Sequence, residues 1–207
     1  DCTASEGVPT MYKLIFASGI HVITANKKGL SGTIELYEEI MRSSKSNHKS
    51  FYYETTAGAG LPFIKSLRDI ILTGDKVVKI EGIFSGTLSY LFNTYDGSIP
   101  FSKIISEAKD MGFTEPDPRE DLSGMDVARK LVILAREMNL KITTEDVDVE
   151  SLVDRDLEDL SVDGYLEKLK DYDAEMKEKL DQARKNNKVL RYIARLNPSG
   201  SATVKLE

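Results

Sequence analysis

Residues 115–130 combine carboxylates, prolines and a lysine in a pattern suited to binding a small charged molecule. The two prolines of EPDPRED fix their own φ and bias the residues before them toward extended backbone, so the loop is stiff. A rigid loop that is rich in carboxylates suits a substrate with an ammonium group. Four carboxylates fall within these seven residues, at Glu115, Asp117, Glu120 and Asp121.

The apolar helix that follows carries Asp126 and Lys130 four residues apart, and therefore on one face. The spacing alone favours a solvent-facing ion pair, which would contribute less than about 1 kcal/mol. The alternative is a site in which carboxylates clamp an amine and Lys130 faces the other end of the ligand. Helix dipoles favour acids at N-termini, which gives Glu120 and Asp121 a structural reason to be there, whereas Glu115 lies too far upstream.

A second candidate site is the small-residue bend in YETTAGAGLP. Gly58, Ala59 and Gly60 follow a predicted strand and precede a predicted helix, so the bend exposes backbone carbonyls. Together with Glu54 these carbonyls would suit a hard cation, which prefers oxygen ligands. The alternative is a tight, closely packed turn. The bend is not a phosphate loop, because neither GxGxxG nor GxxxxGK[ST] occurs in the chain.

Two further segments place polar side chains at the ends of predicted strands. Lys27 follows the short apolar run HVITA, and ligands of α/β sheets bind at the carboxyl ends of such strands. It either reaches a substrate oxygen or is an ordinary surface lysine. Residues 85–87 lie at a strand-to-helix junction, where they bind a polar group or cap the helix. His21 and His48 are too isolated to form a metal pair.

Helices and short strands alternate in the elements that must position these residues. Residues 6–19 are predicted to form a helix with an apolar side made of Met11, Leu14, Ile15 and Ala17, followed by a strand in HVITA. Ser31 or Thr33 is the expected N-cap of the next helix. Further helices are predicted over 31–44, 63–74, 87–95, 102–111, 123–139 and, as one helix or two, 165–188. Strands are predicted at the start of 50–62, over 75–86, and as a hairpin over 189–207.

Composition excludes several classes of protein. The chain of 207 residues has a formal net charge of −6, which argues against binding to nucleic acid or to an anionic membrane surface. No apolar run approaches the roughly 18 residues of a membrane span. A single cysteine, Cys2, rules out an intrachain disulfide and favours a reducing compartment, the cytoplasm.

Four separated motifs, in this order and at these distances, resemble homoserine dehydrogenases, above all the short, single-function kind of fungi. They are VITANKK, YYETTAGAGLP, IEGIFSGTLSYLFN and GFTEPDPREDLSGMDVARKLVIL, and the resemblance covers nearly the whole chain. It implies interconversion of homoserine and aspartate 4-semialdehyde with NAD or NADP, on the route to threonine, isoleucine and methionine. It also implies a homodimer and a bound monovalent cation, usually sodium.

The resemblance also implies roles for individual residues. Lys130 matches the general acid/base, assisted by Asp126 and Lys27. Glu115 and Asp126 match the acids that hold the amino group, and Asp121 matches a further acid at the site. The remaining substrate contacts would be Gly86, Thr87, Gly112, Phe113 and Thr114. Thr3 and Lys27 match residues near the cofactor. The cation ligands would be Glu54 and the carbonyls of Ala57, Ala59 and Leu61.

The expected fold class is α/β followed by α+β. Residues 1–50 would be the C-terminal remnant of a Rossmann-type dinucleotide-binding domain, and 51–62 a segment for dimerisation and cation binding. Residues 63–207 would form a mixed-sheet substrate domain with helices on one face, truncated at its C-terminal end. Because the chain lacks the GxGxxG unit, we expect the isolated chain to bind cofactor poorly and turn over little.

Two other functional hypotheses remain open on the sequence alone. The chain is alternatively a non-catalytic, truncated module that dimerises or binds an amino acid. A further alternative is a different Rossmann-type dehydrogenase with a related substrate domain. The stretch TEPDPREDLSGMDVARK argues against this alternative.

Overall fold

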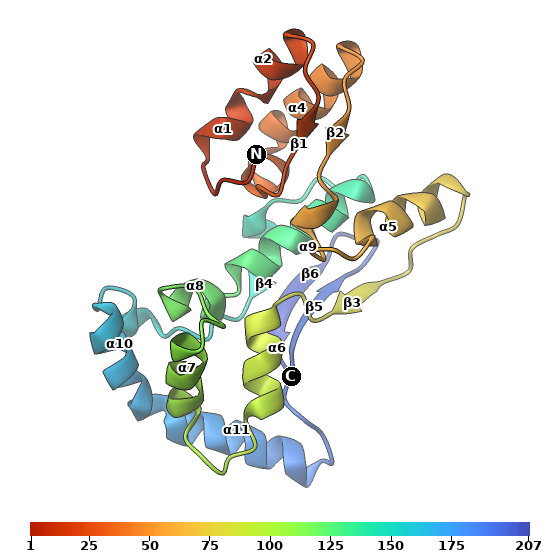
Figure 1. The fold of residues 1–207 in the computed structure, drawn as a ribbon. Helices are drawn as coiled ribbons and strands as arrows, with labels where there is room; N and C mark the ends of the chain where they lie inside the picture. Colours follow the sequence, from red (N-terminus) through yellow and green to blue (C-terminus); the bar gives the residue numbers. More distant parts are fainter.

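Two hydrophobic cores organise the chain, of which the computed structural model describes all residues, 1–207 (Figure 1). A small core of Tyr12, Phe16, Val22 and Ile40 holds together the N-terminal unit, residues 1–52. A cluster of 35 buried residues holds together the remainder, which we call the main body. Leu30 comes from the N-terminal unit but belongs to the larger cluster, so the two parts are packed against each other.

Short parallel strands and the helices beside them form the N-terminal unit. β1 pairs in parallel with β2, with Val22 opposite Phe51. The backbone of Asp1 extends this pattern, because its nitrogen donates to Ile23 O at 2.7 Å and its carbonyl accepts from Ala25 N at 3.0 Å. Parallel strands flanked by helices are the expected architecture of a Rossmann-type remnant. The elements are α1 (Gly7–Thr10), α2 (Tyr12–Ala17), β1 (Val22–Ile23), α3 (Lys28–Ser31), α4 (Ile34–Ser46) and β2 (Phe51–Tyr52).

The prediction of which side of residues 6–19 faces the core is wrong. The segment forms two short helices, and the inward positions are Tyr12 and Phe16, four residues apart on α2. Both rings make edge-to-face contacts with Phe51, which fixes that face toward the core. Met11 and Leu14 are therefore turned outward and are 53% and 60% exposed.

The main body is built on a mixed four-stranded sheet of order β3-β5-β6-β4. The predicted hairpin is confirmed: β5 (Tyr192–Leu196) and β6 (Ala202–Leu206) are antiparallel, with Tyr192 opposite Leu206. β4 (Val147–Val149) lies parallel to β6 at one edge. β3 (Ile80–Gly82) pairs with β5 at the other edge.

The strand predicted over 75–86 is mostly absent, because only Ile80–Gly82 pair. In the antiparallel register Ile80 lies opposite Leu196, the last residue of β5. Residues before Ile80 therefore run past the end of the hairpin and have no strand to pair with. The apolar alternation of DKVVKIEG does not reveal this limit, since register depends on a partner far along the chain.

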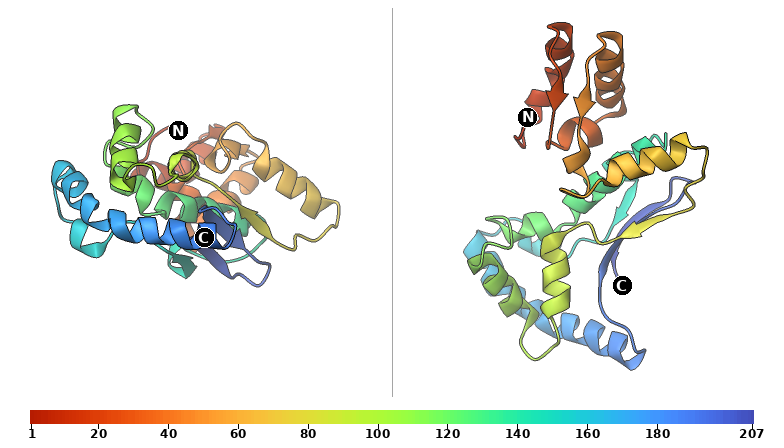
Figure 2. Two further views of the ribbon diagram at one scale, coloured as in Figure 1. Left: turned by 90° about the horizontal axis from the view of Figure 1, so that it is seen from below. Right: turned by 45° about the vertical axis from the view of Figure 1, so that its right-hand side comes forward.

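Helices cover one face of the sheet, and α9 lies at the centre (Figures 1 and 2). Val127, Leu131 and Leu134 of α9 are buried in the larger core. The charged segment 165–188 is two helices joined by a 3-10 turn at Leu169–Tyr172, which bears out the two-helix alternative. None of the helices is both long and apolar enough to cross a bilayer. The helices are α5 (Phe63–Leu72), α6 (Gly86–Thr94), α7 (Phe101–Asp110), α8 (Pro118–Leu122), α9 (Met125–Glu137), α10 (Val162–Lys168) and α11 (Asp173–Lys185).

Candidate active site

The junction between α8 and α9 sets the direction of the helix that carries Asp126 and Lys130. The helix predicted over 123–139 is confirmed with slightly narrower bounds: α9 spans Met125–Glu137, and Gly124, with φ 73°, is its N-cap. A side chain at Gly124 would overlap the hydroxyl of Tyr192 and lie 3.0 Å from Val149 Cγ1. Glycine is therefore required here both by backbone conformation and by the close approach of the sheet.

Asp126 lies between two lysines from different parts of the fold. Lys130 Nζ is 2.7 Å from Asp126 Oδ2, the ion pair that the helical spacing predicts. Lys27 Nζ, from the N-terminal unit, is 3.1 Å from Asp126 Oδ1. Lys130 also donates to the carbonyl of Phe84 at 2.7 Å, which fixes its ammonium group at the end of β3.

This cluster is neither an ordinary surface pair nor a buried one. The side chain of Lys130 is 18% exposed and that of Asp126 is 44% exposed, so solvent reaches the carboxylate more easily than the ammonium. Burial works against the charge of Asp126, but hydrogen bonds and ion pairs with Lys130 and Lys27 outweigh it. They hold the pKa of Asp126 below its ordinary value of 3.8. The carboxylate is thus ionised at neutral pH.

The acidic loop before α8 is fixed by hydrogen bonds of its own. Asp117 is the N-cap of α8 and accepts from Arg119 N at 3.0 Å. The hydrogen bond and charge of Arg119 lower the pKa of Asp117 against a smaller opposing effect of burial. Asp121 Oδ2 accepts from the backbone nitrogen of Glu115 at 2.8 Å, which closes the loop. The carboxylate of Glu115 makes no hydrogen bond or ion pair within the chain.

A cavity of about 640 Å³ opens where the N-terminal unit meets this loop and α9. Its lining carries both signs of charge, which suits a zwitterionic ligand such as an amino acid. It brings together five of the residues predicted for the site, and the charged lining residues are Lys27, Lys28, Glu115, Glu120, Asp121, Asp126 and Arg129, with Thr3 beside them.

Of the other residues predicted to bind a ligand, only Ser85 lines this cavity. Lys130 is joined to it through Asp126. Thr87 donates to the carbonyl of Phe113 at 2.8 Å and so ties the start of α6 to the loop before Glu115. Ser85, expected either to cap α6 or to bind a polar group, accepts from Leu88 N at 3.1 Å and also lines the cavity. Gly86, Gly112 and Thr114 lie in the same two segments.

Sequence reasoning missed three residues of this site. Asn26 is 3% exposed, and its amide donates to Ser5 O at 2.8 Å while its Oδ1 accepts from Lys28 N at 2.9 Å. It therefore shapes the loop that presents Lys27. Lys28 pairs with Glu6 at 2.8 Å. Arg129 lines the cavity and has no ion pair within the chain. The sequence feature that could have identified them is their position beside predicted site residues: Asn26 and Lys28 flank Lys27 in TANKK, and Arg129 precedes Lys130 in VARK.

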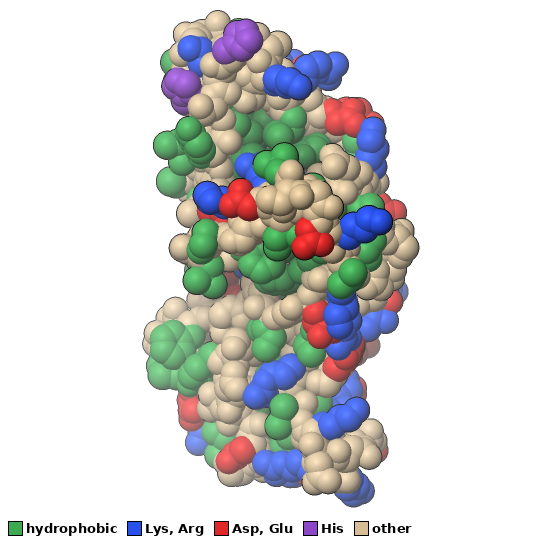
Figure 3. Space-filling model, turned by 90° about the vertical axis from the view of Figure 1, so that its right-hand side faces the viewer, with side chains coloured by type: hydrophobic (Ala, Val, Ile, Leu, Met, Phe, Trp, Pro, Cys, Tyr) green, Lys and Arg blue, Asp and Glu red, His purple; other side chains and the backbone are tan.

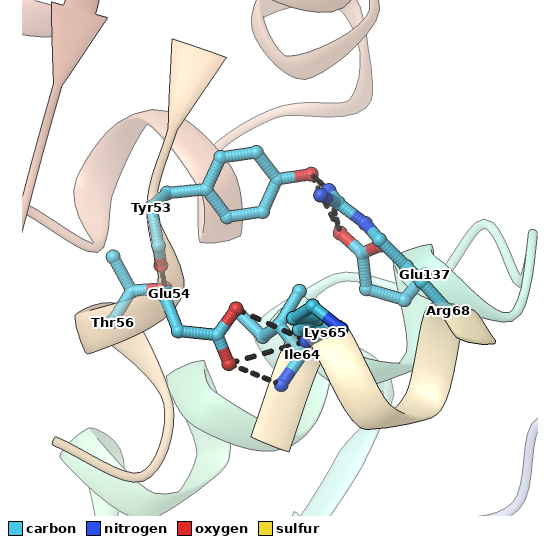
Figure 4. Close-up of polar contacts among 7 residues, drawn as sticks. All are labelled: Tyr53, Glu54, Thr56, Ile64, Lys65, Arg68 and Glu137. Carbon is cyan, nitrogen blue, oxygen red and sulfur yellow. Dashed lines mark hydrogen bonds and ion pairs between the residues drawn. The ribbon is translucent and has the colours of Figure 1, made fainter. Parts of the chain in front are cut away.

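The candidate cation site is a tight loop closed by Glu54 (Figure 4). Glu54 accepts from the backbone nitrogens of Ile64 at 2.8 Å and Lys65 at 3.0 Å, and so caps α5. The carbonyls of Ala57 and Ala59 accept no hydrogen bond within the chain. No group of three or more His, Cys, Asp or Glu side chains forms a metal site.

Comparison with known proteins identifies the family. A model of the homoserine dehydrogenase family matches residues 62–207, and one of the NAD-binding domain of homoserine dehydrogenase matches 1–54. The chain belongs to the homoserine dehydrogenase family. The resemblance stated from the motifs is confirmed, and so is the fold class.

Relatives of two kinds match this chain. It is 47% identical to the chloroplastic bifunctional aspartokinase/homoserine dehydrogenase 1 of Arabidopsis thaliana, over 93% of the chain and 21% of that protein. It is 40% identical to a homoserine dehydrogenase of Paracoccidioides brasiliensis, over 97% of the chain and 56% of that protein. The crystal structure of a Candida auris protein of unknown function superposes with TM-score 0.93 at 41% identity, over the whole chain and 60% of that protein. The chain therefore spans between a fifth and three fifths of these relatives.

Proposed function

We propose that this chain is the substrate-binding part, with the adjoining end of the nucleotide-binding domain, of an enzyme that interconverts L-homoserine and L-aspartate 4-semialdehyde. The observation that carries the proposal is the Lys27–Asp126–Lys130 cluster beside a cavity of mixed charge. The cluster joins the two parts of the fold where a cofactor and a substrate would have to meet. Membership of the homoserine dehydrogenase family supports this reaction.

Lys130 is the residue that we assign to proton transfer. In reduction its ammonium donates a proton to the developing alkoxide and becomes a neutral amine, and in oxidation that neutral amine accepts the proton of the substrate hydroxyl. Its ammonium is already held by Phe84 O and Asp126, so little ordering is required when substrate binds. Asp126 keeps Lys130 oriented and, with Lys27, keeps the local charge balanced.

The carboxylates of the cavity are assigned to the ammonium group of homoserine. Glu115 is free of partners within the chain and lies on the loop that Asp121 closes, so it is available to a ligand. Asp126 contributes a second carboxylate from α9. The neighbouring segments that would surround the rest of the substrate contain Gly86, Thr87, Gly112, Phe113 and Thr114.

Thr3 and Lys27 are assigned to the nicotinamide end of the cofactor. Both line the cavity on the side of the N-terminal unit, and the cavity of about 640 Å³ leaves enough volume for a ring. When bound, NAD or NADP would supply or accept the hydride. Residues 1–207 contain no GxGxxG, so a pyrophosphate cradle is not among them.

We assign a monovalent cation to the loop of Glu54 and the carbonyls of Ala57, Ala59 and Leu61. Ala57 O and Ala59 O accept no hydrogen bond within the chain and Glu54 supplies a carboxylate, and such oxygen donors are of the kind that hard cations prefer, whereas Leu61 O already accepts from Phe63 N at 2.8 Å. We also assign residues 51–62 to a homodimer interface. Figure 3 shows hydrophobic groups among charged ones on the side of α5, and Tyr52 and Leu61 are 58% and 69% exposed.

The experiment that tests this function is an assay of the full-length protein. Reduction of NAD⁺ and NADP⁺ is followed by absorbance with L-homoserine, L-serine and L-threonine as substrates. We expect turnover with homoserine that exceeds turnover with the other two hydroxy amino acids at least about tenfold. Equal turnover with all three, or none with homoserine, would contradict the assignment.

A further inference from the structure

Arg136, in the last turn of α9, is a buried cation that the proposed reaction does not use. It is 4% exposed. Its guanidinium donates to Leu30 O and to Gly32 O, each at 2.6 Å, and to Ile142 O at 3.2 Å. It also stacks over the ring of Tyr37, 5.0 Å from the centroid. A buried charge is expensive unless its donors are satisfied, and these carbonyls satisfy them.

Two of the carbonyls that Arg136 binds, those of Leu30 and Gly32, lie at the end of α3, the helix that follows Lys27. Lys27 is the N-cap of α3 and pairs with Asp126 at the start of α9. Leu30 and Gly32 lie at the other end of α3, where helix carbonyls lack partners within the helix and favour a cation. α3 is therefore attached to α9 at both ends.

α9 fixes the distance between these two points of attachment. Asp126 and Arg136 are ten residues apart on one helix, a separation of about 15 Å that does not vary. α3 itself is closely packed, since a side chain at Gly29 would lie 2.8 Å from Pro9 Cβ and 3.1 Å from Ile40 Cδ1. A rigid helix held at one end by Arg136 presents Lys27 at a fixed place relative to Asp126.

We propose that Arg136 is a positioning residue, which holds α3 so that the ammonium of Lys27 meets Asp126 and Lys130 in the arrangement the reaction needs. This inference rests on the proposed function of that cluster. It assigns Arg136 no contact with substrate or cofactor. Its effect on the reaction passes through α3 and Lys27.

A neighbouring network provides the control for a merely structural role. Glu137, the next residue of α9, is held by Arg68 Nε at 2.5 Å and by the hydroxyl of Tyr53 at 2.6 Å (Figure 4). Burial and the charge of Glu137 raise the pKa of Tyr53 well above its ordinary value, so its hydroxyl stays protonated and donates. This network joins α5 to α9 without touching α3 or the cavity. Arg68→Met removes a different anchor of α9, which is 40% exposed and has no hydrogen bond to α3, so we expect α3 to stay in place.

The first test is a double-mutant cycle on kcat/KM for homoserine in the full-length protein. We expect Arg136→Lys, which keeps the charge but loses the forked geometry, to lower kcat/KM about tenfold. In the Lys27→Ala background the same change should cost less than about twofold, because the group that it positions is gone. Arg68→Met should lower kcat/KM by the same factor in both backgrounds. Equal losses for Arg136→Lys in both backgrounds would overturn the proposal.

The second test does not depend on activity. Amide hydrogen exchange of residues 28–32 is measured by mass spectrometry in the same full-length variants. Leu30 N, Ser31 N and Gly32 N donate to carbonyls within α3 and its N-cap, so loosening of α3 accelerates their exchange. We expect at least about threefold faster exchange there in Arg136→Lys and none in Arg68→Met. Unchanged exchange would refute the proposal, whereas absence of wild-type turnover with homoserine would refute only the proposed function.

Discussion

The ammonium of Lys27 lies 3.1 Å from the carboxylate of Asp126, and this ion pair joins the N-terminal unit to the helix that carries Lys130. The same carboxylate binds Lys130 at 2.7 Å through its other oxygen. One acid thus couples a lysine of the N-terminal unit, which we assign to the cofactor, to the residue that we assign to proton transfer. Substitution of Asp126 should therefore affect both the N-terminal unit, through Lys27, and the main body, through Lys130.

The charge of Asp126 makes stability depend on pH. The pKa of Asp126 is lower in the folded than in the unfolded state. Its carboxylate therefore stabilises the fold at pH values above the ordinary pKa of 3.8, and this stabilisation is lost as pH falls through the folded-state pKa. At neutral pH we expect Asp126→Asn to lower the free energy of unfolding by about 1 kcal/mol or less, because solvent screens the cluster. In urea titrations the difference from wild type should shrink as pH falls below 3.8 and vanish once the pH is below the folded-state pKa. A difference that grows on acidification would contradict this assignment of charge.

Gly124 is the position at which α8 turns into α9, and Gly124→Ala tests that turn. Alanine at φ 73° is strained, and its Cβ would press on Tyr192 and Val149. We expect a loss of about 1–3 kcal/mol in the free energy of unfolding. Gly7→Ala is the control, because its Cβ would meet only Ser5 Oγ at 3.7 Å. Equal stability of the two variants in thermal unfolding would show that the close approach is not a constraint.

Glu54 is expected to combine a helix cap with cation binding. Glu54→Gln retains the shape but weakens the bonds to Ile64 N and Lys65 N, and we expect a loss of about 1 kcal/mol. Activity of the full-length variant should also lose any dependence on sodium. Asp69→Asn on the same helix breaks only an exposed pair with Lys65 and should cost less than about 0.5 kcal/mol. Retention of the sodium response by Glu54→Gln would remove the carboxylate from the proposed ligands.

Local features of the site could be predicted from the sequence, whereas its long-range partners could not. The pair Asp126–Lys130 follows from helical periodicity, and Glu54, Lys27 and Glu115 stand out by their neighbours. The contact of Lys27 with Asp126 depends on how α3 packs on α9, which no local pattern contains. The helix caps show the same limit. The sequence allowed either Ser31 or Thr33 as the N-cap of α4, and the structure has Thr33, whose hydroxyl accepts from Leu36 N at 3.3 Å.

The fold shows where local patterns are overruled by packing. The hairpin over 189–207 was predictable because its turn residues and alternation are local. Met11 and Leu14 were assigned inward by hydrophobicity, but the rings of Tyr12 and Phe16 occupy that face. The residues before Ile80 alternate like a strand but meet the end of β5.

The most direct test of the central claim is steady-state oxidation of L-homoserine by full-length Lys130→Ala. Removal of a general acid/base lowers turnover by about 10²- to 10⁴-fold, and we expect a decrease of that size in kcat with a much smaller change in KM. Lys103→Ala, an exposed lysine on α7 that is paired only with Glu107, is the control and should retain wild-type turnover. Turnover of Lys130→Ala within a few-fold of wild type would contradict the role assigned to this lysine.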